Sequence, residues 1–408
     1  MKRRQFLAAG ATAALASLLP LGLGSRALAQ GGDSKRLIVI FLRGGLDGLS
    51  ALPPQDDPIY CRARPSIALP PVGQEGGALP LAPGFGLHPA LEPLLEPWKA
   101  GLLAFVPACG LPTPLRSHPE AQKAMESGNP REQHVRDGFF ARLLPLLGPG
   151  AKGLTLSPAP PIISQGRPGF QQIKPTGFPP SLWRIERPEV FTSFDAIYGK
   201  APEPWGRNYR QAQIVLKNRF TEMDREMTAA ASGAPSVHAL PDMAGKIVSY
   251  LGQNPATRLV YAAFGGIDAH FEQGAAKGKL ADALASIGKG LALLAKALGP
   301  DLKDTMVLVM SEFGRSLREN EYGGTDNGHG TVLMSLGGPT AGGALHGAWP
   351  GLAPEKLSDG LDLAVTVDYR EVLAGVVTAH FGLGLEAVAQ VLPGYTPDGS
   401  VQPLFRRG

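Results

Sequence analysis

The sequence predicts an α/β fold in which helices cover both faces of a doubly wound, mostly parallel β-sheet. Three observations support this prediction. Short runs of β-branched and other apolar residues alternate along the chain with longer segments of helical periodicity, as expected for parallel strands joined by crossover helices. The run Arg36–Leu42 is apolar at every position after the arginine, so both faces of that strand should be buried. No internal repeat or low-complexity linker divides residues 30–408, and we expect them to form one domain.

Apolar runs bounded by Gly, Pro or polar residues predict the remaining strands. Residues 51–87 are rich in Pro and Gly and are expected to form irregular surface. Residues 148–206 are turn-rich, and we expect an insertion or a cap there rather than a separate domain. In chain order, strands are expected at 36–42, 102–106, 153–157, 169–173, 258–264, 305–310 and 331–336.

Capping residues and helical periodicity predict the helices between these strands. Ser117, with Pro119 in the first turn and Glu120 three positions on, is typical of a helix N-terminus. A stripe at spacings of four and three predicts a long helix packed on the sheet, with Leu280, Leu284, Ile287, Leu291, Leu294 and Leu298 on one side. In chain order, helices are expected at 88–98, 117–126, 133–147, 208–230, 243–252, 280–298 and 369–380.

Residues 1–29 have the three zones of an export signal. Lys2-Arg-Arg-Gln-Phe-Leu7 is followed by an apolar run and then by the small residues of Ala27-Leu-Ala29. The arginine pair indicates the twin-arginine pathway. We therefore expect the twin-arginine translocase as a partner during export, a periplasmic or extracellular location, and no stable membrane span after cleavage. An uncleaved N-terminal anchor is the alternative.

The net charge excludes one class of partner. The full chain carries +4, and residues 1–29 contain four cations and no acid, so residues 30–408 are neutral overall. A nucleic-acid partner therefore has no electrostatic support. Cys61 and Cys109 lack the spacing of a metal or redox pair, and the sequence leaves open whether they form a disulfide.

Acids, histidines and one serine gather at the ends of five of the predicted strands, namely 36–42, 102–106, 258–264, 305–310 and 331–336. Ligands of open α/β sheets bind beyond the carboxyl ends of the strands, so this placement predicts a functional site. The residues are Asp47 after the first of these strands, Ser117 and His118 after the second, Asp268 and His270 after the third, Glu312 after the fourth, and Asp326 and His329 in the loop before the fifth.

Carboxylates and imidazoles together suit a divalent metal such as zinc, or manganese where oxygen ligands dominate. Asp268 and His270 are two residues apart, so an extended backbone would point both side chains at one ion. The glycines around His329 give a backbone that can bring its side chain close to a site. Ser117 would present a hydroxyl at a helix N-terminus, where an anion or an alkoxide is stabilised.

Several of these residues also have a structural interpretation. Asp47 and Asp326 are common turn residues, and Ser117 is an ordinary N-cap. His118 is expected to be exposed in the first turn of its helix. Glu312 is placed to pair with Arg315 or Arg318, while Arg43 and Arg315 would either bind an oxyanion or pair with the acids. The other histidines are expected to be structural, namely His88, His134, His238, His346 and His380.

Four motifs in order resemble the exported bacterial family catalogued as domain of unknown function 1501, and the resemblance extends over nearly all of residues 30–408. They are Leu42-Arg-Gly-Gly-Leu-Asp-Gly-Leu-Ser50, Arg116-Ser-His-Pro-Glu-Ala-Gln-Lys-Ala-Met-Glu126, Asp268-Ala-His270 with Gln273, and Ser311-Glu-Phe-Gly-Arg315 followed by Glu319-Asn320 and Gly324-Thr-Asp326. That family is grouped with the alkaline phosphatase-like superfamily, which includes phosphatases, arylsulfatases and cofactor-independent phosphoglycerate mutases. The resemblance implies an alkaline phosphatase-like fold.

The resemblance also implies roles for individual residues. Asp47 resembles a metal-binding aspartate after the first strand, and Ser117 resembles the nucleophile at a helix N-terminus. Asp268 and His270 are similar to the acid and the histidine that bind a first metal. Glu312 resembles the acid of an Asp-His pair that holds a second metal, and Asp326 or His118 would have to substitute for the histidine of that pair. His329 resembles a last histidine in a Gly-rich loop.

Two positions depart from the superfamily pattern. Phe313 stands where an Asp-His pair would place its histidine, and Asn327 stands where relatives usually carry histidine in Gly-Thr-Asp-His-Gly. A site short of two imidazoles favours a harder ion such as Mg, Mn or Ca, or no ion.

Together these features predict an exported, metal-dependent hydrolase of small-molecule phosphate or sulfate esters. Ser117 would attack the phosphorus or sulfur, and Arg43 or Arg315 would hold the nonbridging oxygens. The first alternative is a non-catalytic binding or assembly protein with a decayed metal site, as Phe313 and Asn327 suggest. The second is a metal-free serine esterase, against which the absence of a Gly-x-Ser-x-Gly elbow counts.

Overall fold

An eight-stranded sheet forms the centre of the protein. A computed structural model describes residues 35–132, 136–175 and 188–406. Two small antiparallel hairpins lie outside the sheet, β2 (Leu79–Ala82) with β3 (Phe85–Leu87) and β9 (Arg315–Glu319) with β10 (Thr325–Asn327). The strands of the main sheet are β1 (Arg36–Leu42), β4 (Leu103–Gly110), β5 (Lys152–Leu156), β6 (Phe170–Ile173), β7 (Thr257–Phe264), β8 (Thr305–Ser311), β11 (Thr331–Gly337) and β12 (Val367–Asp368).

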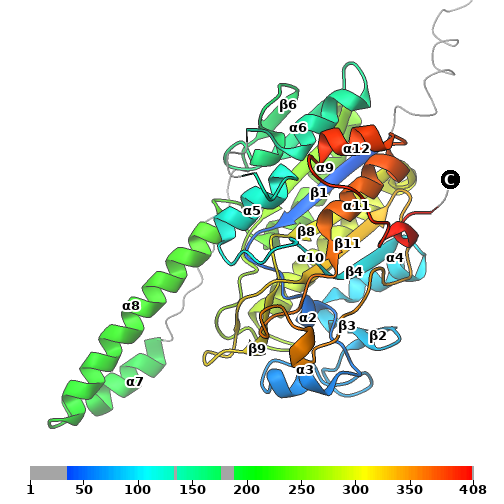
Figure 1. Ribbon diagram of the computed structural model, residues 1–408. Coiled ribbons are helices and arrows are strands. Elements are labelled where there is room, and N and C mark those ends of the chain that lie inside the picture. The colour runs from blue at the N-terminus through cyan, green and yellow to red at the C-terminus, as the bar shows by residue number, and fades with distance from the viewer. Residues whose placement is uncertain (1–34, 133–135, 176–187, 407–408) are drawn as a thin grey trace, which may run out of the picture.

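The strands follow the order β12-β4-β11-β8-β1-β7-β5-β6 (Figure 1). Neighbouring strands are parallel except where β11 lies between β4 and β8, to which it is antiparallel. The prediction of a mostly parallel α/β sheet is therefore confirmed. The three central strands β8, β1 and β7 come from distant parts of the sequence and pair over nearly their whole lengths.

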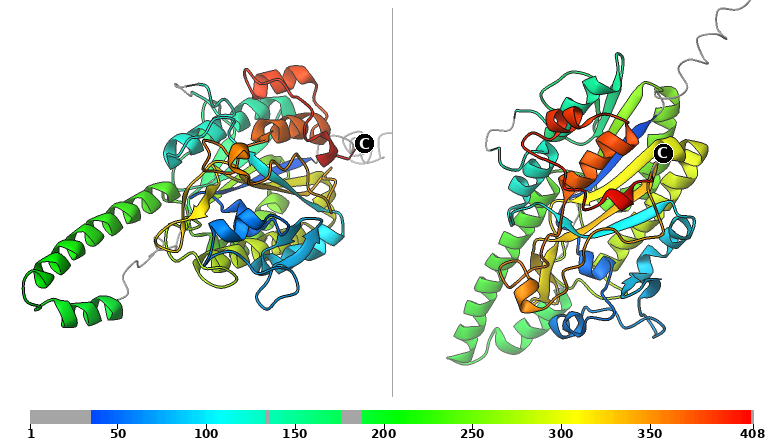
Figure 2. Two further views of the ribbon diagram at one scale, coloured as in Figure 1. Left: turned by 60° about the horizontal axis from the view of Figure 1, so that its bottom comes forward. Right: turned by 45° about the vertical axis from the view of Figure 1, so that its right-hand side comes forward.

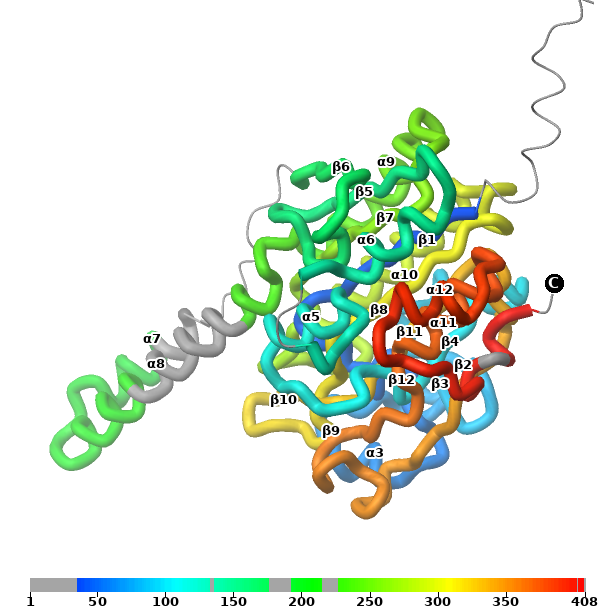
Figure 3. The backbone as a smooth tube through the Cα atoms, turned by 45° about the horizontal axis from the view of Figure 1, so that its top comes forward, coloured from blue at the N-terminus to red at the C-terminus, as the bar shows by residue number. Residues whose placement is uncertain are grey.

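Helices cover both faces of this sheet, so the predicted double winding is also confirmed. Alternate residues of β1 enter two separate cores, because successive side chains of a strand point to opposite faces. Ile38 and Ile40 pack toward η1, α4, α9 and α10, whereas Val39 and Phe41 pack toward α5, α6, α11 and α12. The backbone trace in Figure 3 shows where α5, α6, α11 and α12 lie around the strands. These helices are η1 (Pro89–Leu94), α4 (Leu95–Lys99), α9 (Leu240–Gln253) and α10 (Lys279–Leu298) on one face, and α5 (His118–Ser127), α6 (Phe139–Leu143), α11 (Tyr369–Gly375) and α12 (Leu385–Val391) on the other.

Shorter elements complete the chain. A π-helix, Val376–His380, continues α11, so the helix expected at 369–380 is present with a change of winding. The remaining helices are α2 (Gly48–Ala51), α3 (Pro58–Ala63), α7 (Pro188–Tyr198) and α8 (Trp205–Ala231), with 3₁₀ turns η2 (Leu144–Leu147), η3 (Ile162–Ser164), η4 (Val237–Ala239), η5 (Gly299–Asp304), η6 (Pro354–Lys356) and η8 (Gln402–Leu404).

Helices α7 and α8 form an arm that projects away from the sheet and its covering helices (Figures 1 and 2). The arm returns to the body at the last turn of α8, where the carbonyl of Ala230 accepts a hydrogen bond from Gln122 of α5. Strands β5 and β6, which also fall within the expected insertion at 148–206, instead belong to the main sheet.

Two local predictions are wrong. The helix expected at 133–147 begins only at Phe139, because Gly138 lies against the backbone of Ile162 and Ile163 and the chain there is extended. Residues 133–135 lie outside the described residues. The segment 51–87 is more ordered than expected, since it contains α3 and the β2–β3 hairpin and buries side chains such as Tyr60.

The N-terminal prediction concerns residues 1–29, which lie outside the described part of the chain. Within the described residues, no helix combines the length and the apolar character required to cross a bilayer. Both cysteines are free thiols, with Cys61 exposed and Cys109 buried in β4.

Candidate metal centre

Three side chains converge beyond the carboxyl ends of the central strands. His118 is the first residue of α5, and Asp268 and His270 follow β7. Nε2 of His118 lies 3.5 Å from Oδ2 of Asp268, and Nε2 of His270 lies 3.2 Å from Oδ1. One ligand atom from each residue fits within 4.8 Å of the other two. All three side chains are buried.

The atoms that face one another in this cluster lack hydrogen-bond partners. Among the described residues, neither Nε2 of His118 and His270 nor either carboxylate oxygen of Asp268 has one. Arg315 approaches Oδ1 of Asp268 with its Nη1 at 2.9 Å and forms an ion pair with the carboxylate. Buried polar atoms without a partner are costly and rare in folded proteins, so their convergence here requires an explanation.

Each imidazole is oriented from behind by a carboxylate. Nδ1 of His118 lies 2.8 Å from Oε1 of Glu312, the residue that directly follows β8. Nδ1 of His270 lies 3.4 Å from Oδ1 of Asp326, in β10. A carboxylate at Nδ1 favours the tautomer that carries its proton there, which leaves the Nε2 lone pair directed at the cluster. This is the usual arrangement around histidine ligands of metals.

Electrostatics keep both supporting carboxylates ionised. Burial alone would raise the pKa of Glu312, but hydrogen bonding and charge from His118, with hydrogen bonds from Gln122 and the Gly44 amide, hold it below its ordinary value. The hydrogen bond from His270 likewise lowers the pKa of Asp326 against a smaller effect of burial. Both carboxylates are therefore acceptors at neutral pH.

These donors fit a divalent metal. Two imidazole nitrogens and one carboxylate oxygen form a three-ligand set of the kind found in catalytic zinc sites, which keep a further position for water or substrate. The imidazoles favour zinc or another transition metal over magnesium or calcium, which prefer oxygen ligands.

The turn after β1 passes close to this cluster. Gly44 has a φ of +119°, and a Cβ there would lie 3.0 Å from the amide nitrogen of Asp268. A side chain at this position would therefore displace the backbone that carries a cluster residue. Phe313 packs against the imidazole of His118 with ring centroids 4.6 Å apart, so the phenyl group supports the cluster without contributing a ligand.

Asp47 lies in a different network. Its carboxylate pairs with Nη1 of Arg64 at 2.7 Å and accepts further hydrogen bonds from Ser50 and Gln273. Burial would raise the pKa of Asp47, but the Arg64 guanidinium and these hydrogen bonds hold it below its ordinary value. Asp47 is thus an ionised carboxylate neutralised within the protein.

The arginines considered as oxyanion ligands are buried and paired. Arg43 contacts Glu126 of α5, which also accepts a hydrogen bond from Tyr261, although Nε of Arg43 has no partner among the described residues. Arg315 contacts Asp268 and donates to Asn327 and to the carbonyl of Thr325. Of the two roles considered for these arginines, the contacts in the structure are those of pairing with acids.

The structure does not bring His329 into the cluster. Nε2 of its ring lies 2.8 Å from the carbonyl oxygen of Leu111, and Nδ1 lies 3.1 Å from the Ser358 hydroxyl. Burial lowers the pKa of His329. Ser117 caps α5 immediately before His118, is half-buried, and makes no capping hydrogen bond through its side chain.

Two expectations about individual side chains are wrong. His118 is buried rather than exposed, because Glu312 and Phe313 at the end of β8 hold its ring against the sheet. Glu312 pairs with His118 and Gln122 rather than with Arg315 or Arg318, since Arg315 is turned toward Asp268.

Sequence reasoning missed several residues that organise the site. Gln122 and Glu126 follow His118 at intervals of four, which places all three on one side of α5 toward the strand ends. That spacing is visible in the sequence and was the available signal. Arg64 had no such signal, since it lies in an irregular region and reaches Asp47 only through the tertiary fold.

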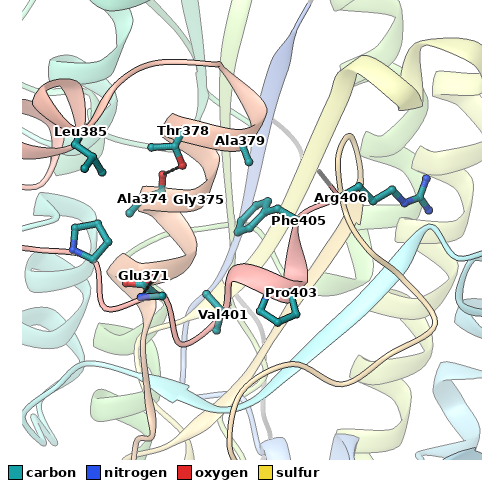
Figure 4. Close-up of a pocket in the computed structure, with 12 residues that line it drawn as sticks. Glu371, Ala374, Gly375, Thr378, Ala379, Leu385, Val401, Pro403, Phe405 and Arg406 are labelled. Atoms are coloured by element: carbon teal, nitrogen blue, oxygen red, sulfur yellow. Dashed lines mark hydrogen bonds between the residues drawn. The ribbon is translucent and has the colours of Figure 1, made fainter. Parts of the chain in front are cut away.

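A separate cavity of about 810 Å³ lies between α11, the π-helix and the C-terminal segment (Figure 4). Its wall is largely apolar, as Leu385 and Phe405 illustrate. Glu371, the acid in this wall, already accepts hydrogen bonds from the Tyr395 hydroxyl and two backbone amides. None of the three cluster residues lines this cavity.

Comparison with known proteins gives a family-model match to part of the chain and several distant structures. The chain resembles Ps i-CgsB, solved in complex with k-i-k-neocarrahexaose, at 14% identity and a TM-score of 0.44, over 90% of this chain and 75% of that chain. It also resembles a protein in the alkaline phosphatase superfamily from Vibrio parahaemolyticus (13% identity, TM-score 0.36, 75% of this chain and 61% of that chain). A third is the PsFucS1 sulfatase from Pseudoalteromonas sp. (13% identity, TM-score 0.39, 88% and 70%).

No curated protein matches the sequence. Residues 212–392, which include Asp268, His270 and Glu312, match the model of the family described as "Protein of unknown function (DUF1501)". The resemblance to this family that the sequence motifs predict is therefore confirmed over those residues.

Proposed function

We propose that the protein is a metal-dependent hydrolase of phosphate or sulfate esters, with His118, Asp268 and His270 as the metal ligands. One observation carries the proposal. Four buried ligand atoms of these residues face one another without hydrogen-bond partners among the described residues, and both imidazoles have a carboxylate at Nδ1. Arg315 also lies 2.9 Å from Oδ1 of Asp268, and a cation held by the two imidazoles and one carboxylate oxygen would provide the partner that the remaining atoms lack.

The metal supplies Lewis acidity toward an ester oxygen when it is bound. The chain's own residues supply the rest. Glu312 and Asp326 hold the ligand imidazoles in one tautomer, and Arg315 holds the Asp268 carboxylate. These contacts fix the ligands before substrate arrives.

Ser117 is the nucleophile in this proposal. It directly precedes the ligand His118, and its hydroxyl is not used to cap α5. The N-terminus of α5, a helix of ten residues, provides a positive dipole end that favours an anionic group. A tetrahedral phosphate or sulfate ester is the class of anionic substrate that a hydroxyl nucleophile next to a metal ligand would attack at phosphorus or sulfur.

The test is metal analysis of the purified protein and of an Asp268→Ala/His270→Ala variant. We expect one metal per chain in the natural protein and none in the variant, with a His88→Ala variant retaining its metal because the ring nitrogens of His88 bond to protein atoms. Screening of aryl phosphate and aryl sulfate esters follows, in which Ser117→Ala should keep the metal and lose hydrolysis. Absence of metal after reconstitution with zinc, manganese, magnesium and calcium would reject the proposal.

A binding protein that retains the metal without catalysis is the second candidate. It is favoured by the close burial of the cluster and by the complete engagement of His329 and Asp47 with protein partners. Stoichiometric metal with no hydrolysis of any ester, and no effect of Ser117→Ala, would establish this candidate instead.

Export by the twin-arginine pathway to the periplasm or exterior belongs to the same proposal and rests on Arg3 and Arg4. An Arg3→Lys/Arg4→Lys variant should remain in the cytoplasm, while the natural protein is exported and processed. Equal export of both would reject this route.

A further inference from the structure

The α7–α8 arm ends in a tip that lies far from the sheet (Figures 1 and 2). Helix α8 has 27 residues, which corresponds to a length of roughly 40 Å. It begins with Trp205 at the tip and ends at the body. We define the arm tip as residues 194–214, which comprise the end of α7, the connecting loop and the first turns of α8.

The arm tip concentrates exposed apolar side chains. Five of the nine large hydrophobic residues that are exposed in the described part of the chain fall within it. Such a concentration marks an interaction surface, whereas single exposed hydrophobic residues are ordinary. The five residues are Phe194 (49% exposed), Ile197 (65%), Tyr198 (41%), Trp205 (68%) and Ile214 (58%).

These side chains surround the arm tip rather than form one stripe. Trp205 and Ile214 are nine positions apart, so at 100° per residue they project from opposite sides of α8. A helix that pairs with another helix exposes a stripe along one side. Apolar side chains on all sides of the arm tip are instead suited to an apolar environment that surrounds the tip.

The polar residues of the arm tip complement an anionic surface. Lys200, Arg207 and Arg210 are exposed, and Glu203 accepts contacts from both arginines. The other carboxylate, Asp195, accepts a hydrogen bond from Tyr209 on the neighbouring helix. The arm tip thus carries three cations and two carboxylates, a net charge of +1, with Arg207 and Arg210 both paired to Glu203, whereas residues 30–408 as a whole are neutral.

We infer that the arm tip docks the protein on a membrane by inserting its aromatic and aliphatic side chains into the interface of an anionic bilayer. Trp and Tyr prefer the headgroup region, and Lys and Arg add attraction to anionic lipids. The ring contact between Tyr198 of α7 and Tyr209 of α8 holds the two helices together, and Phe194 stacks on Tyr198 within α7, so the tip can enter as a rigid unit. This docking is peripheral and is independent of the proposed hydrolysis.

The test is co-sedimentation of the purified protein with vesicles of mixed phosphatidylethanolamine and phosphatidylglycerol. The key variant is Ile197→Ser/Trp205→Ser, and the matched control is Leu361→Ser/Leu385→Ser, which removes two exposed leucines from the body. We expect the tip variant to bind more than about tenfold more weakly, given the apolar area withdrawn from the bilayer, and the control to bind like the natural protein. Because all three proteins carry the same N-terminal segment, their differences report on the mutated positions.

Vesicles of phosphatidylcholine alone test the charge argument, and weaker binding to them is expected. No sedimentation of the natural protein with anionic vesicles, or equal binding by the tip variant, would overturn the inference. So would light scattering that shows a dimer converted to a monomer by the tip variant with vesicle binding unchanged, since the arm tip would then bind a second copy of the chain.

Discussion

Nε2 of His118 and Oδ2 of Asp268 face each other at 3.5 Å, and neither has a hydrogen-bond partner among the described residues. With its Nδ1 proton directed to Glu312, the imidazole of His118 presents a lone pair to a carboxylate oxygen. Two acceptors in contact repel each other unless a cation lies between them or a second proton enters the ring. The predictions about metal binding follow from this pair and its neighbours.

Replacement of His118 by alanine should abolish stoichiometric metal binding. The variant removes one of three ligands and leaves Asp268 and His270, which cannot complete a three-ligand site alone. Metal content per chain after dialysis measures the effect. The His88→Ala variant is the control, because it also removes a buried histidine but leaves the cluster intact. Undiminished metal in His118→Ala would remove this histidine from the ligand set.

A Glu312→Gln variant should bind metal about 10–100-fold more weakly while still reaching one metal per chain at saturation. Glu312 fixes the tautomer of His118, and loss of such a supporting carboxylate usually has an effect of this size. Competition with a chromophoric chelator measures the affinity. Glu319→Gln, which changes an acid of β9 that contacts Ser66, should leave the affinity unchanged. An unchanged affinity in Glu312→Gln would mean that the carboxylate does not orient the ligand.

The sequence was sufficient to predict that polar side chains gather at the carboxyl ends of the strands, but not which of them form the cluster of His118, Asp268 and His270. Asp268 and His270 were identifiable because a buried apolar strand, Thr257–Phe264, ends directly before them, and the carboxyl ends of parallel strands meet at one edge. Glu312 was identifiable on the same ground. The burial of His118 was not, because it depends on contacts with Glu312 and Phe313 nearly two hundred residues away.

Pairing among the charged residues was the least predictable feature. Asp47 follows the first strand, where the sequence predicts a metal ligand, yet its charge is balanced by Arg64, which belongs to an irregular segment with no periodic signal. The strand and helix segments were easier to predict, since their local patterns agree with their packing. The helix expected from residue 133 begins only at Phe139, because Gly138 lies close to Ile163 and the chain there is extended.

An Arg64→Met variant should lose about 3–5 kcal/mol of unfolding free energy at neutral pH, because it leaves the Asp47 carboxylate buried without its countercharge. Urea unfolding measures this loss. An Asp47→Asn/Arg64→Met variant should lose less, since no unpaired charge remains. Metal content should be unchanged in both variants, and loss of metal in the double variant would instead place Asp47 among the ligands.

The difference in unfolding free energy between the Arg64→Met variant and the natural protein should become smaller as the pH falls. Arg64 holds the pKa of Asp47 below its ordinary value, so the ion pair contributes stability above about pH 3.9, and this stability is lost as the pH falls through the lower, folded-state pKa. Without Arg64, burial raises the pKa of Asp47, and protonation then relieves the unpaired charge at moderately acidic pH. Urea unfolding between neutral pH and about pH 4 measures the narrowing gap. A gap that widens on acidification would contradict the ion-pair interpretation.

His380 should make the protein less stable in mild acid. Burial lowers its pKa from 6.5 to about 4, and Nε2 of the neutral ring lies 2.9 Å from the carbonyl oxygen of Arg36 at the start of β1. Because the folded-state pKa is depressed, the contribution of His380 to stability is fully present above about pH 6.5 and is lost as the pH falls toward 4. At about 1.4 kcal/mol per unit, the loss amounts to roughly 3 kcal/mol. Unfolding free energies of the natural protein and of His380→Gln across this range should therefore converge as the pH falls, with a smaller slope in the variant. Some slope remains in the variant because burial also lowers the pKa of His88 and His329.

His238→Gln, which changes an exposed histidine, should keep the pH dependence of the natural protein. A His380→Gln profile as steep as the natural one would show that His380 is not the responsible group.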